Sequence, residues 1–165
     1  MNAENKSIKN SGLANTSAES SSDGLILVAD DESAIVELIV ECLNDSGYEI
    51  ITARDGLEAV RLYKEAQPDL IISDIVMPKL DGLSVIKEIQ QDFPELKAIL
   101  MTGYPAVARD FLSEKMTELG VVCLLEKPLN VLELITTTHL IMDDRKTGQS
   151  KQRSPSELDM LVDFA

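Results

Sequence analysis

The stretch PDLIISDIVMPKLDG, residues 68–82, joins a short apolar run to a loop rich in turn-forming residues. Its apolar part, LIISD at residues 70–74, has the length and composition of a buried β-strand and ends on Asp74. Pro78 and Gly82 then favour a loop before the next helical pattern begins. The sequence therefore predicts a buried strand that delivers Asp74 to its carboxyl end.

Apolar runs of similar length recur on both sides of this strand, and segments with a helical period separate them. Further strands are predicted at residues 25–31, 48–53, 98–103 and 121–127. Helices are predicted at 34–46, from Asp55 to the residue before Pro68, and at 83–92, 106–119 and 131–142. Asp55 and Glu58, three residues apart, predict a capping box. Five strands alternating with five helices indicate an α/β fold, a doubly wound parallel sheet with helices on both faces.

Polar segments lie on either side of this alternating region. Residues 1–23 are rich in Ser, Asn and Lys without apolar periodicity, and we expect a disordered N-terminal tail. The folded domain is expected to span residues 24–142, and residues 143–165 to form a flexible C-terminal tail. The chain closes with the apolar and acidic sequence LDMLVDFA, for which two interpretations stay open: a frayed terminus and a docking peptide.

The charge of the chain argues against some classes of partner. Acidic residues number 29 and basic residues 15, which gives a net charge of 15 − 29 = −14. Nucleic acids and anionic membranes bind basic surfaces, so we expect neither as a direct partner. The first residues, MNAENKSIKN, contain no apolar signal segment, and no apolar run approaches the roughly 18 residues that a membrane-spanning helix needs. We therefore expect a cytoplasmic protein.

Polar side chains gather where the predicted strands end. Asp30 and Asp31 end the first strand, and Asp74 ends the third. Thr102 and Lys127 stand at the ends of the fourth and fifth strands. Because the carboxyl ends of parallel strands meet at one edge of the sheet, we expect three carboxylates, a hydroxyl and an ammonium group to converge there.

Three neighbouring carboxylates repel one another unless a cation lies among them. Mg²⁺ prefers oxygen ligands and is typically held by one or two carboxylates together with phosphate oxygens. A metal ion and the Lys127 ammonium group would neutralise a phosphoryl group while a fixed carboxylate attacks it. Asp74 is the best-placed nucleophile, because it ends the middle strand whereas Asp30 and Asp31 come as a pair.

Four segments resemble the receiver domains of response regulators in two-component signalling: ILVADDE at 26–32, PDLIISDIVMPKLDG at 68–82, ILMTG at 99–103 and LLEKPL at 124–129. The resemblance extends over residues 25–142 and implies a five-stranded sheet in the flavodoxin-like order 2-1-3-4-5. It implies a phosphoprotein that carries an aspartyl phosphate, and a signalling domain rather than an enzyme.

The resemblance also implies a role for each residue at the strand ends. Asp74 would accept a phosphoryl group from a histidine kinase or a histidine phosphotransfer protein in a phosphorelay. The implied magnesium ligands are Asp30, Asp31, Asp74 and the backbone carbonyl of Val76, and the implied contacts of the phosphoryl oxygens are Thr102 and Lys127.

Two further positions follow the family pattern, and one departs from it. The peptide bond before Pro128 is usually cis in the family, and Gly82 fills a loop position where a side chain would strain the backbone. Leu124 stands where the family usually has Tyr or Phe, a ring that moves inward on phosphorylation. Leu124 is therefore either a smaller switch or a fixed packing residue.

Val76 and Tyr104 stand two residues beyond Asp74 and Thr102 respectively. Neither side chain acts as a strong acid or base toward water near neutral pH, and both are bulky enough to shield a phosphoryl group. We predict slow self-dephosphorylation.

The segment after the fifth predicted helix is too short for an output domain, so we expect a stand-alone receiver that signals through protein contacts. A downstream protein is expected to bind through the fourth helix, the fifth strand and the fifth helix. The fifth helix, VLELITTTHLIM at 131–142, is apolar or Thr-bearing on nearly every side. Such a helix favours coverage by a partner, by a second copy in a homodimer, or by the C-terminal tail.

Two alternatives come from other functional classes. Flavodoxins and aspartate-nucleophile phosphatases share the doubly wound fold. The loop DDESA at residues 30–34 argues against a flavodoxin, because its acidic side chains would repel phosphate in the absence of a metal. The same loop argues against a phosphatase, because it supplies no suitable DxD pair. The second alternative is a receiver-like interaction module that signals without phosphorylation. The intact set of Asp, Thr and Lys argues against this module, and Leu124 argues for it.

Overall fold

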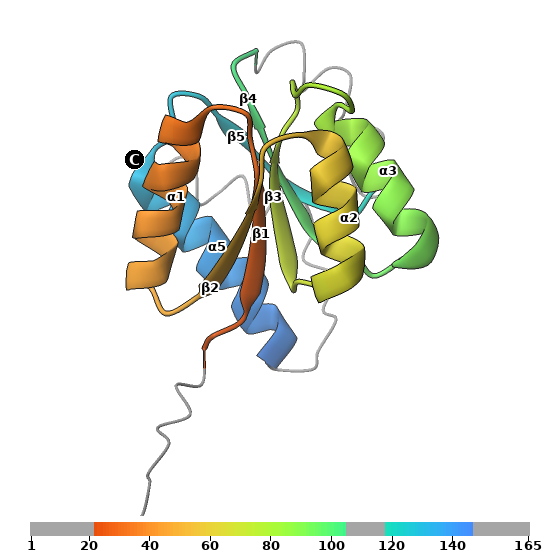
Figure 1. Cartoon of the computed structure of the whole chain (residues 1–165). Coiled ribbons are helices and arrows are strands. Elements are labelled where there is room, and N and C mark those ends of the chain that lie inside the picture. Colours follow the sequence, from red (N-terminus) through yellow and green to blue (C-terminus); the bar gives the residue numbers. More distant parts are fainter. Residues whose placement is uncertain (1–21, 105–117, 147–165) are drawn as a thin grey trace, which may run out of the picture.

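Five parallel strands form a single sheet in the order β2-β1-β3-β4-β5 in the computed structural model, which describes residues 22–104 and 118–146 (Figure 1). The strands are β1 (Leu25–Ala29), β2 (Glu49–Ala53), β3 (Leu70–Asp74), β4 (Ala98–Thr102) and β5 (Val121–Glu126). This arrangement confirms the predicted fold class and strand order. β3 lies in the middle of the sheet and is buried along its whole length.

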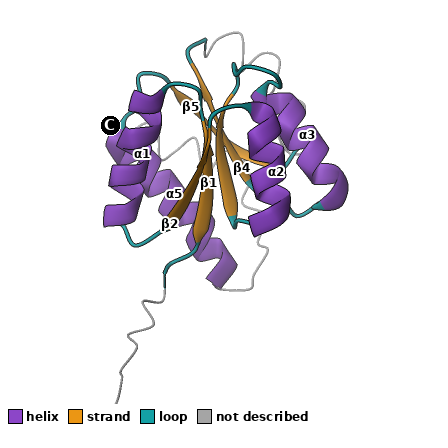
Figure 2. Ribbon diagram, in the orientation of Figure 1, coloured by secondary structure: helices purple, strands orange, loops and turns teal. Residues whose placement is uncertain are grey.

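Helices cover both faces of the sheet (Figure 2). They are α1 (Ser33–Asp45), α2 (Gly56–Ala66), α3 (Gly82–Asp92) and α5 (Val131–Lys146). α2 and α3 lie side by side on one face, whereas α1 and α5 lie on the other. No helix in the described part of the chain is both long and apolar enough to cross a membrane. The helix predicted at 106–119 lies almost entirely outside the described residues, as do most residues of the tails predicted at 1–23 and 143–165.

Two apolar clusters fill the space between the sheet and the helices, one on each face. Side chains alternate along a strand, so successive residues of β1 and β3 enter opposite clusters. Leu27 and its paired neighbour Ile71 face α2 and α3, whereas Ile26 and Ile72 face α1 and α5. Because both faces are covered, the strands have to be nearly continuous apolar runs, which is why they are visible in the sequence.

Aspartates begin two of the helices that follow the strands. Asp55 caps α2, because its side chain accepts a hydrogen bond from Glu58 N at 3.0 Å. The Glu58 carboxylate in turn accepts a hydrogen bond from Arg54 N at 2.9 Å, one residue before the amide that a capping box requires. The prediction that Asp55 caps the helix is thus confirmed, whereas the predicted hydrogen bond from Asp55 N to the Glu58 carboxylate is wrong. Asp81 caps α3 in the same way, through Ser84 N at 3.0 Å.

Predicted and observed boundaries differ mainly where polar residues follow an apolar run. β1 ends at Ala29 and β5 ends at Glu126, so Asp30 and Lys127 belong to the loops rather than to the strands. At the other end of the domain, α5 continues to Lys146, beyond the predicted end of the helix at residue 142. Asp74 and Thr102 are still the last residues of β3 and β4, so the polar groups at this edge of the sheet come partly from strand ends and partly from loops.

β5 contains an irregularity next to its neighbour β4. Ala98 pairs with Val121, but the next residue, Ile99, pairs with Cys123. Val122 is therefore an extra residue in β5, which is the definition of a β-bulge. The pairing resumes its regular register from Cys123 to Glu126.

Candidate functional site

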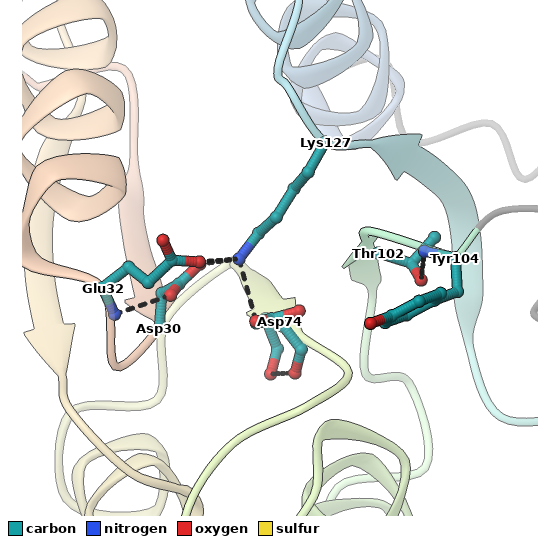
Figure 3. A network of polar contacts seen from close by, with 7 residues as sticks. Asp30, Glu32, Asp74, Thr102, Tyr104 and Lys127 are labelled. Carbon is teal, nitrogen blue, oxygen red and sulfur yellow. Dashed lines mark hydrogen bonds and ion pairs between the residues drawn. The ribbon is translucent and has the colours of Figure 1, made fainter.

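The carboxyl ends of β1, β3 and β5 bring Asp30, Asp74 and Lys127 into direct contact (Figure 3). Lys127 Nζ lies 2.8 Å from Asp30 Oδ2 and 2.8 Å from Asp74 Oδ2. The three side chains are largely buried, with 13% of Lys127, 0% of Asp30 and 9% of Asp74 exposed. The structure thus joins three residues that are far apart in the sequence into one charged cluster.

Several neighbouring carboxylates stabilise the protonated, positively charged form of Lys127. Burial opposes the charged form of its ammonium group, but the close contacts with the Asp30 and Asp74 carboxylates and their negative charges outweigh burial, so the pKa of Lys127 is raised. Glu32, which the sequence argument missed, adds a third carboxylate at 3.2 Å from Lys127 Nζ. Its place two residues after Asp30 is the signal that could have found it. Because Glu32 is 63% exposed, this contact is weaker than the two buried ones.

Asp30 is the most deeply buried acid of the cluster, with 1% of its surface exposed. Its Oδ1 accepts a hydrogen bond from Glu32 N at 2.9 Å. Among the described residues no donor is aligned for a hydrogen bond with Asp30 Oδ2, whose contact with Lys127 is an ion pair. Burial raises the pKa of Asp30, and the contacts with Lys127 and Glu32 oppose the rise without cancelling it. The ionised carboxylate therefore depends on a nearby positive charge, which Lys127 supplies at 2.8 Å.

Asp31 completes a group of three acids that fits a divalent cation. One carboxylate oxygen from each of Asp30, Asp31 and Asp74 lies within 4.8 Å of the other two. Asp31 is exposed, whereas the other two acids are buried, so the group opens to solvent on one side. The candidate ligands are all oxygens, and Asp30 Oδ2 lacks an aligned hydrogen-bond donor, which together suit the hard cation Mg²⁺.

Thr102 is buried at the end of β4, and its hydroxyl group forms a hydrogen bond within the protein. Thr102 Oγ1 accepts a hydrogen bond from Tyr104 N at 2.9 Å. Figure 3 shows the Tyr104 ring extending from this turn toward the Asp74 side of the site. Tyr104 is 71% exposed and Val76 is 64% exposed, so both form the rim of the cleft rather than its floor. The cleft is lined by Asp31, Glu32, Asp74, Val76, Gly103, Tyr104 and Lys127.

Backbone contacts fix the loop that follows Asp74. Ile75 N donates a hydrogen bond to Met101 O at 3.0 Å, and Gly82 N donates one to Ile75 O at 2.9 Å. A Cβ atom at Gly82 would lie 2.1 Å from Asp74 O, far inside any ordinary contact distance. A side chain at this position would therefore force the backbone of Asp74 and the start of α3 apart.

β5 and the loop after it contain two further residues that the resemblance singled out. Leu124 is half-buried and packs into the cluster that faces α2 and α3. It occupies the family's aromatic position as a packing residue in this state. The Lys127–Pro128 peptide bond is cis, and Lys127 N donates a hydrogen bond to Thr102 O at 2.8 Å. The loop that carries the Lys127 ammonium group is thereby joined to the end of β4.

Comparison with known proteins places this geometry among signalling domains. A family model described as the response regulator receiver domain matches residues 26–139. The alkaline phosphatase synthesis transcriptional regulatory protein PhoP of Bacillus subtilis is 39% identical over 111 residues, which are 66% of this chain and 44% of that protein. The response regulator MprA of Mycolicibacterium vanbaalenii is 32% identical over 141 residues, which are 82% of this chain and 59% of that protein. The chain spans about half the length of the curated relatives it matches.

Solved structures with a similar fold carry related descriptions. A response regulator receiver domain protein from Clostridium thermocellum superposes with a TM-score of 0.67 at 31% identity, over 76% of this chain and 98% of that one. The chemotaxis response regulator CheY4 of Vibrio cholerae superposes with a TM-score of 0.64 at 28% identity, over 71% of this chain and 97% of that one. The likeness thus extends over nearly the whole of each solved chain.

Proposed function

This chain belongs to the response regulator receiver domain family of two-component signalling, and from that membership we propose that Asp74 accepts a phosphoryl group. One observation carries the proposal: the Asp74 carboxylate lies in the cleft, 2.8 Å from the Lys127 ammonium group and beside two further acids. The phosphoryl donor is a histidine kinase or a histidine phosphotransfer protein.

In the proposed reaction, a carboxylate oxygen of Asp74 attacks the phosphorus atom of a phosphohistidine. A P–O bond forms and the P–N bond breaks, with its electron pair remaining on the imidazole nitrogen of the donor. The product is an acyl phosphate on Asp74. Lys127 contributes as a fixed positive charge for the phosphoryl oxygens, because its raised pKa keeps it an ammonium ion at neutral pH.

We assign the magnesium ligands to Asp30, Asp31, Asp74 and the backbone carbonyl of Val76. When bound there, Mg²⁺ would supply positive charge to the oxygens of the transferred group. Burial acts against the ionisation of Asp30 in the metal-free protein, although Asp30 has to be ionised to serve as a ligand. The repulsion among these acids is the reason that a cation should bind favourably.

The Thr102 hydroxyl group is the remaining proposed contact of the phosphoryl oxygens. It accepts the hydrogen bond from Tyr104 N through a lone pair, at 2.9 Å. A hydroxyl group that accepts one hydrogen bond can still donate its own proton. Thr102 can therefore donate to a phosphoryl oxygen without first losing its bond to Tyr104.

Output is proposed to pass through protein–protein contacts rather than through catalysis. The proposed surface comprises β5, α5 and the fourth helix expected at 106–119, which lies almost entirely outside the described residues. This surface would bind a downstream protein or a second copy of the chain. On α5, Val131 and Leu132 are exposed apolar residues that suit such a contact. The proposal places the protein in the cytoplasm and its receiver domain at residues 24–142. Because PhoP is named as a transcriptional regulator, the absence of direct contact with nucleic acid stays a prediction.

The proposal is tested by incubating the protein with Mg²⁺ and acetyl phosphate and measuring its intact mass. The wild-type chain should gain the mass of one phosphoryl group, and Asp74→Asn should gain none. Asp81→Asn is the matched control, because asparagine caps helices as well as aspartate and Asp81 lies outside the cleft. This control should gain the same mass as the wild type.

A wild-type chain that gains no mass at saturating donor would refute phosphoryl transfer to Asp74. That outcome would instead support the module that signals without phosphorylation, in which Leu124 is a permanent packing residue. A mass gain that persists in Asp74→Asn would place the acceptor on another residue.

A further inference from the structure

The loop between β3 and α3 is attached to the start of α2 by an ion pair. Lys79 Nζ lies 2.6 Å from Asp55 Oδ2, although the two residues are 24 positions apart in the chain. Asp55 is mostly buried, with 14% of its side chain exposed, whereas 60% of the Lys79 side chain is exposed. The magnesium ligand proposed on this loop, the carbonyl of Val76, lies only three residues before Lys79.

The backbone of Lys79 has an unusual conformation for its residue type. Its φ is +67°, in the left-handed region that glycine and asparagine adopt most readily. A side chain in this conformation is strained, and such strain persists only where other contacts hold the residue in place. The ion pair with Asp55 is a side-chain contact that can help to hold Lys79 in this conformation.

The surrounding contacts leave this loop little room to move relative to α2. Gly56 N donates a hydrogen bond to Pro78 O at 3.4 Å, and Leu80 N donates one to Pro78 O at 2.8 Å. A Cβ atom at Gly56 would lie 2.0 Å from Leu80 O, so the two segments touch through their backbones. The loop therefore packs directly against the first residue of α2.

The two carboxylate oxygens of Asp55 contact different segments, one the start of α2 and the other the loop. Its Oδ1 accepts the capping hydrogen bond from Glu58 N at 3.0 Å, while its Oδ2 faces Lys79. The hydrogen bond from Lys79, followed by that from Glu58, lowers the pKa of Asp55, so the carboxylate is ionised over the physiological range. The same side chain thus joins the first turn of α2 to the loop that follows the phosphoacceptor.

We propose that Asp55 is a positioning residue that holds the 75–81 loop through Lys79 and thereby sets the affinity of the site for Mg²⁺. The inference rests on the proposed function, because it requires a cation bound by the strand-end acids and the carbonyl of Val76. Neither Asp55 nor Lys79 contacts the cation in this proposal. Their effect is to keep the ligand-bearing loop in the geometry that Mg²⁺ demands, since this ion tolerates little distortion.

The test is a calorimetric titration of the full chain with Mg²⁺, supported by the Mg²⁺ dependence of the melting temperature. Asp55→Asn keeps the helix cap and removes the charge that holds Lys79. Lys79→Asn removes the ammonium group and keeps a residue that tolerates the left-handed conformation. We expect each variant to raise the Kd for Mg²⁺ about threefold, the effect of an ion pair of average strength. The double variant should show no further loss.

The two variants distinguish positioning of the loop from a direct electrostatic effect of each side chain on the Mg²⁺ site. Removing the Asp55 carboxylate would weaken a nearby cation site through simple electrostatics, whereas removing the Lys79 ammonium group would strengthen it. If the ion pair positions the loop, its loss should weaken Mg²⁺ binding in both variants. Lys64→Met is the control, because it breaks another ion pair of α2, with Asp92 of α3 at 2.9 Å. Its Kd for Mg²⁺ should not rise.

Opposite shifts in the two variants, or no shift in either, would overturn the positioning role and leave phosphoryl transfer to Asp74 intact. A wild-type chain that binds no Mg²⁺ and forms no acyl phosphate would overturn the proposed function and this inference together.

Discussion

Replacing Gly82 by alanine should shift the position of Asp74 while it leaves the Asp74 side chain chemically unchanged. Gly82 is the first residue of α3, and an added Cβ would lie 2.1 Å from Asp74 O and 3.1 Å from Ile75 Cα. The nearest atoms are backbone atoms, so they cannot rotate away as the end of a side chain could. Relief of the clash requires the backbone at Asp74 to move relative to α3.

The size of the effect follows from two opposing contributions. Alanine is a better helix former than glycine by about 1 kcal/mol, which favours the variant. A carbon atom and a carbonyl oxygen in contact normally stand about 3.3 Å apart, so the clash demands a displacement of about 1 Å. Overpacking of this kind costs about 1–3 kcal/mol. The net loss in the free energy of unfolding should therefore be about 0–2 kcal/mol, so that the fold survives.

The larger effect should fall on phosphoryl transfer. A displacement of about 1 Å at a reacting group can lower a rate about 100-fold. We therefore expect Gly82→Ala to lower the rate of acyl phosphate formation by that factor while the fold survives. The rate is followed by intact mass with acetyl phosphate, and stability is followed by denaturant unfolding.

Gly103→Ala provides the matched control for this experiment. Gly103 also lines the cleft, but a Cβ atom there would meet no atom within 4 Å. It should leave both the stability and the rate near wild-type values. A Gly82→Ala variant that phosphorylates as fast as Gly103→Ala would refute the idea that the close approach to Asp74 O positions the acceptor.

Five further substitutions test individual features of the site and the core. Asp30→Asn should raise the free energy of unfolding of the metal-free protein by about 1 kcal/mol at neutral pH. Because the pKa of Asp30 is raised in the folded state, this gain should fade as the pH falls through that raised pKa and should be absent below pH 3.8. Mg²⁺ binding by the variant should weaken at neutral pH. Lys127→Met should cost about 3 kcal/mol near pH 7 by breaking a buried ion-pair cluster. Since the folded pKa of Lys127 is raised above 10.5, the difference from wild type should shrink only as the pH rises beyond 10.5, which pH-dependent unfolding would check. Val76→Asn and Tyr104→Glu should each speed the decay of the acyl phosphate, and unchanged or slower decay would count against shielding by these side chains. Thr138→Val should stabilise the fold by about 1 kcal/mol, because the buried Thr138 hydroxyl has no hydrogen-bond partner among the described residues; a lower melting temperature would contradict this.

The architecture could be predicted because its signals are local and repeated. Each strand is an apolar run that stops at a polar residue, and a sheet covered on both faces requires such runs. The ends of the runs locate Asp30, Asp74 and Lys127, and a parallel sheet brings them to one edge. Topology alone therefore accounts for the cluster of acids and ammonium group, without knowledge of any side-chain conformation.

The remaining features depend on side-chain directions that topology does not determine. Glu32 and Lys79 stand on loops, and their ion pairs depend on how each loop bends in three dimensions. The reciprocal bond of Glu58 goes to Arg54 N because the backbone before α2 is arranged differently from an ideal capping box. The extension of α5 to Lys146 was missed because polar residues at a helix end look like the start of a tail.

The extra residue in β5 has a consequence for how copies of this chain can associate. β5 is one of the two outermost strands, and the backbone groups on the open side of such a strand can pair with a strand from another molecule. A regular strand would offer evenly spaced amides and carbonyls, but the bulge at Val122 interrupts that spacing near the beginning of β5. Growth of the sheet from one molecule into the next is therefore disfavoured at this edge. Any homodimer that uses β5 and α5 should therefore form through side chains rather than through strand pairing.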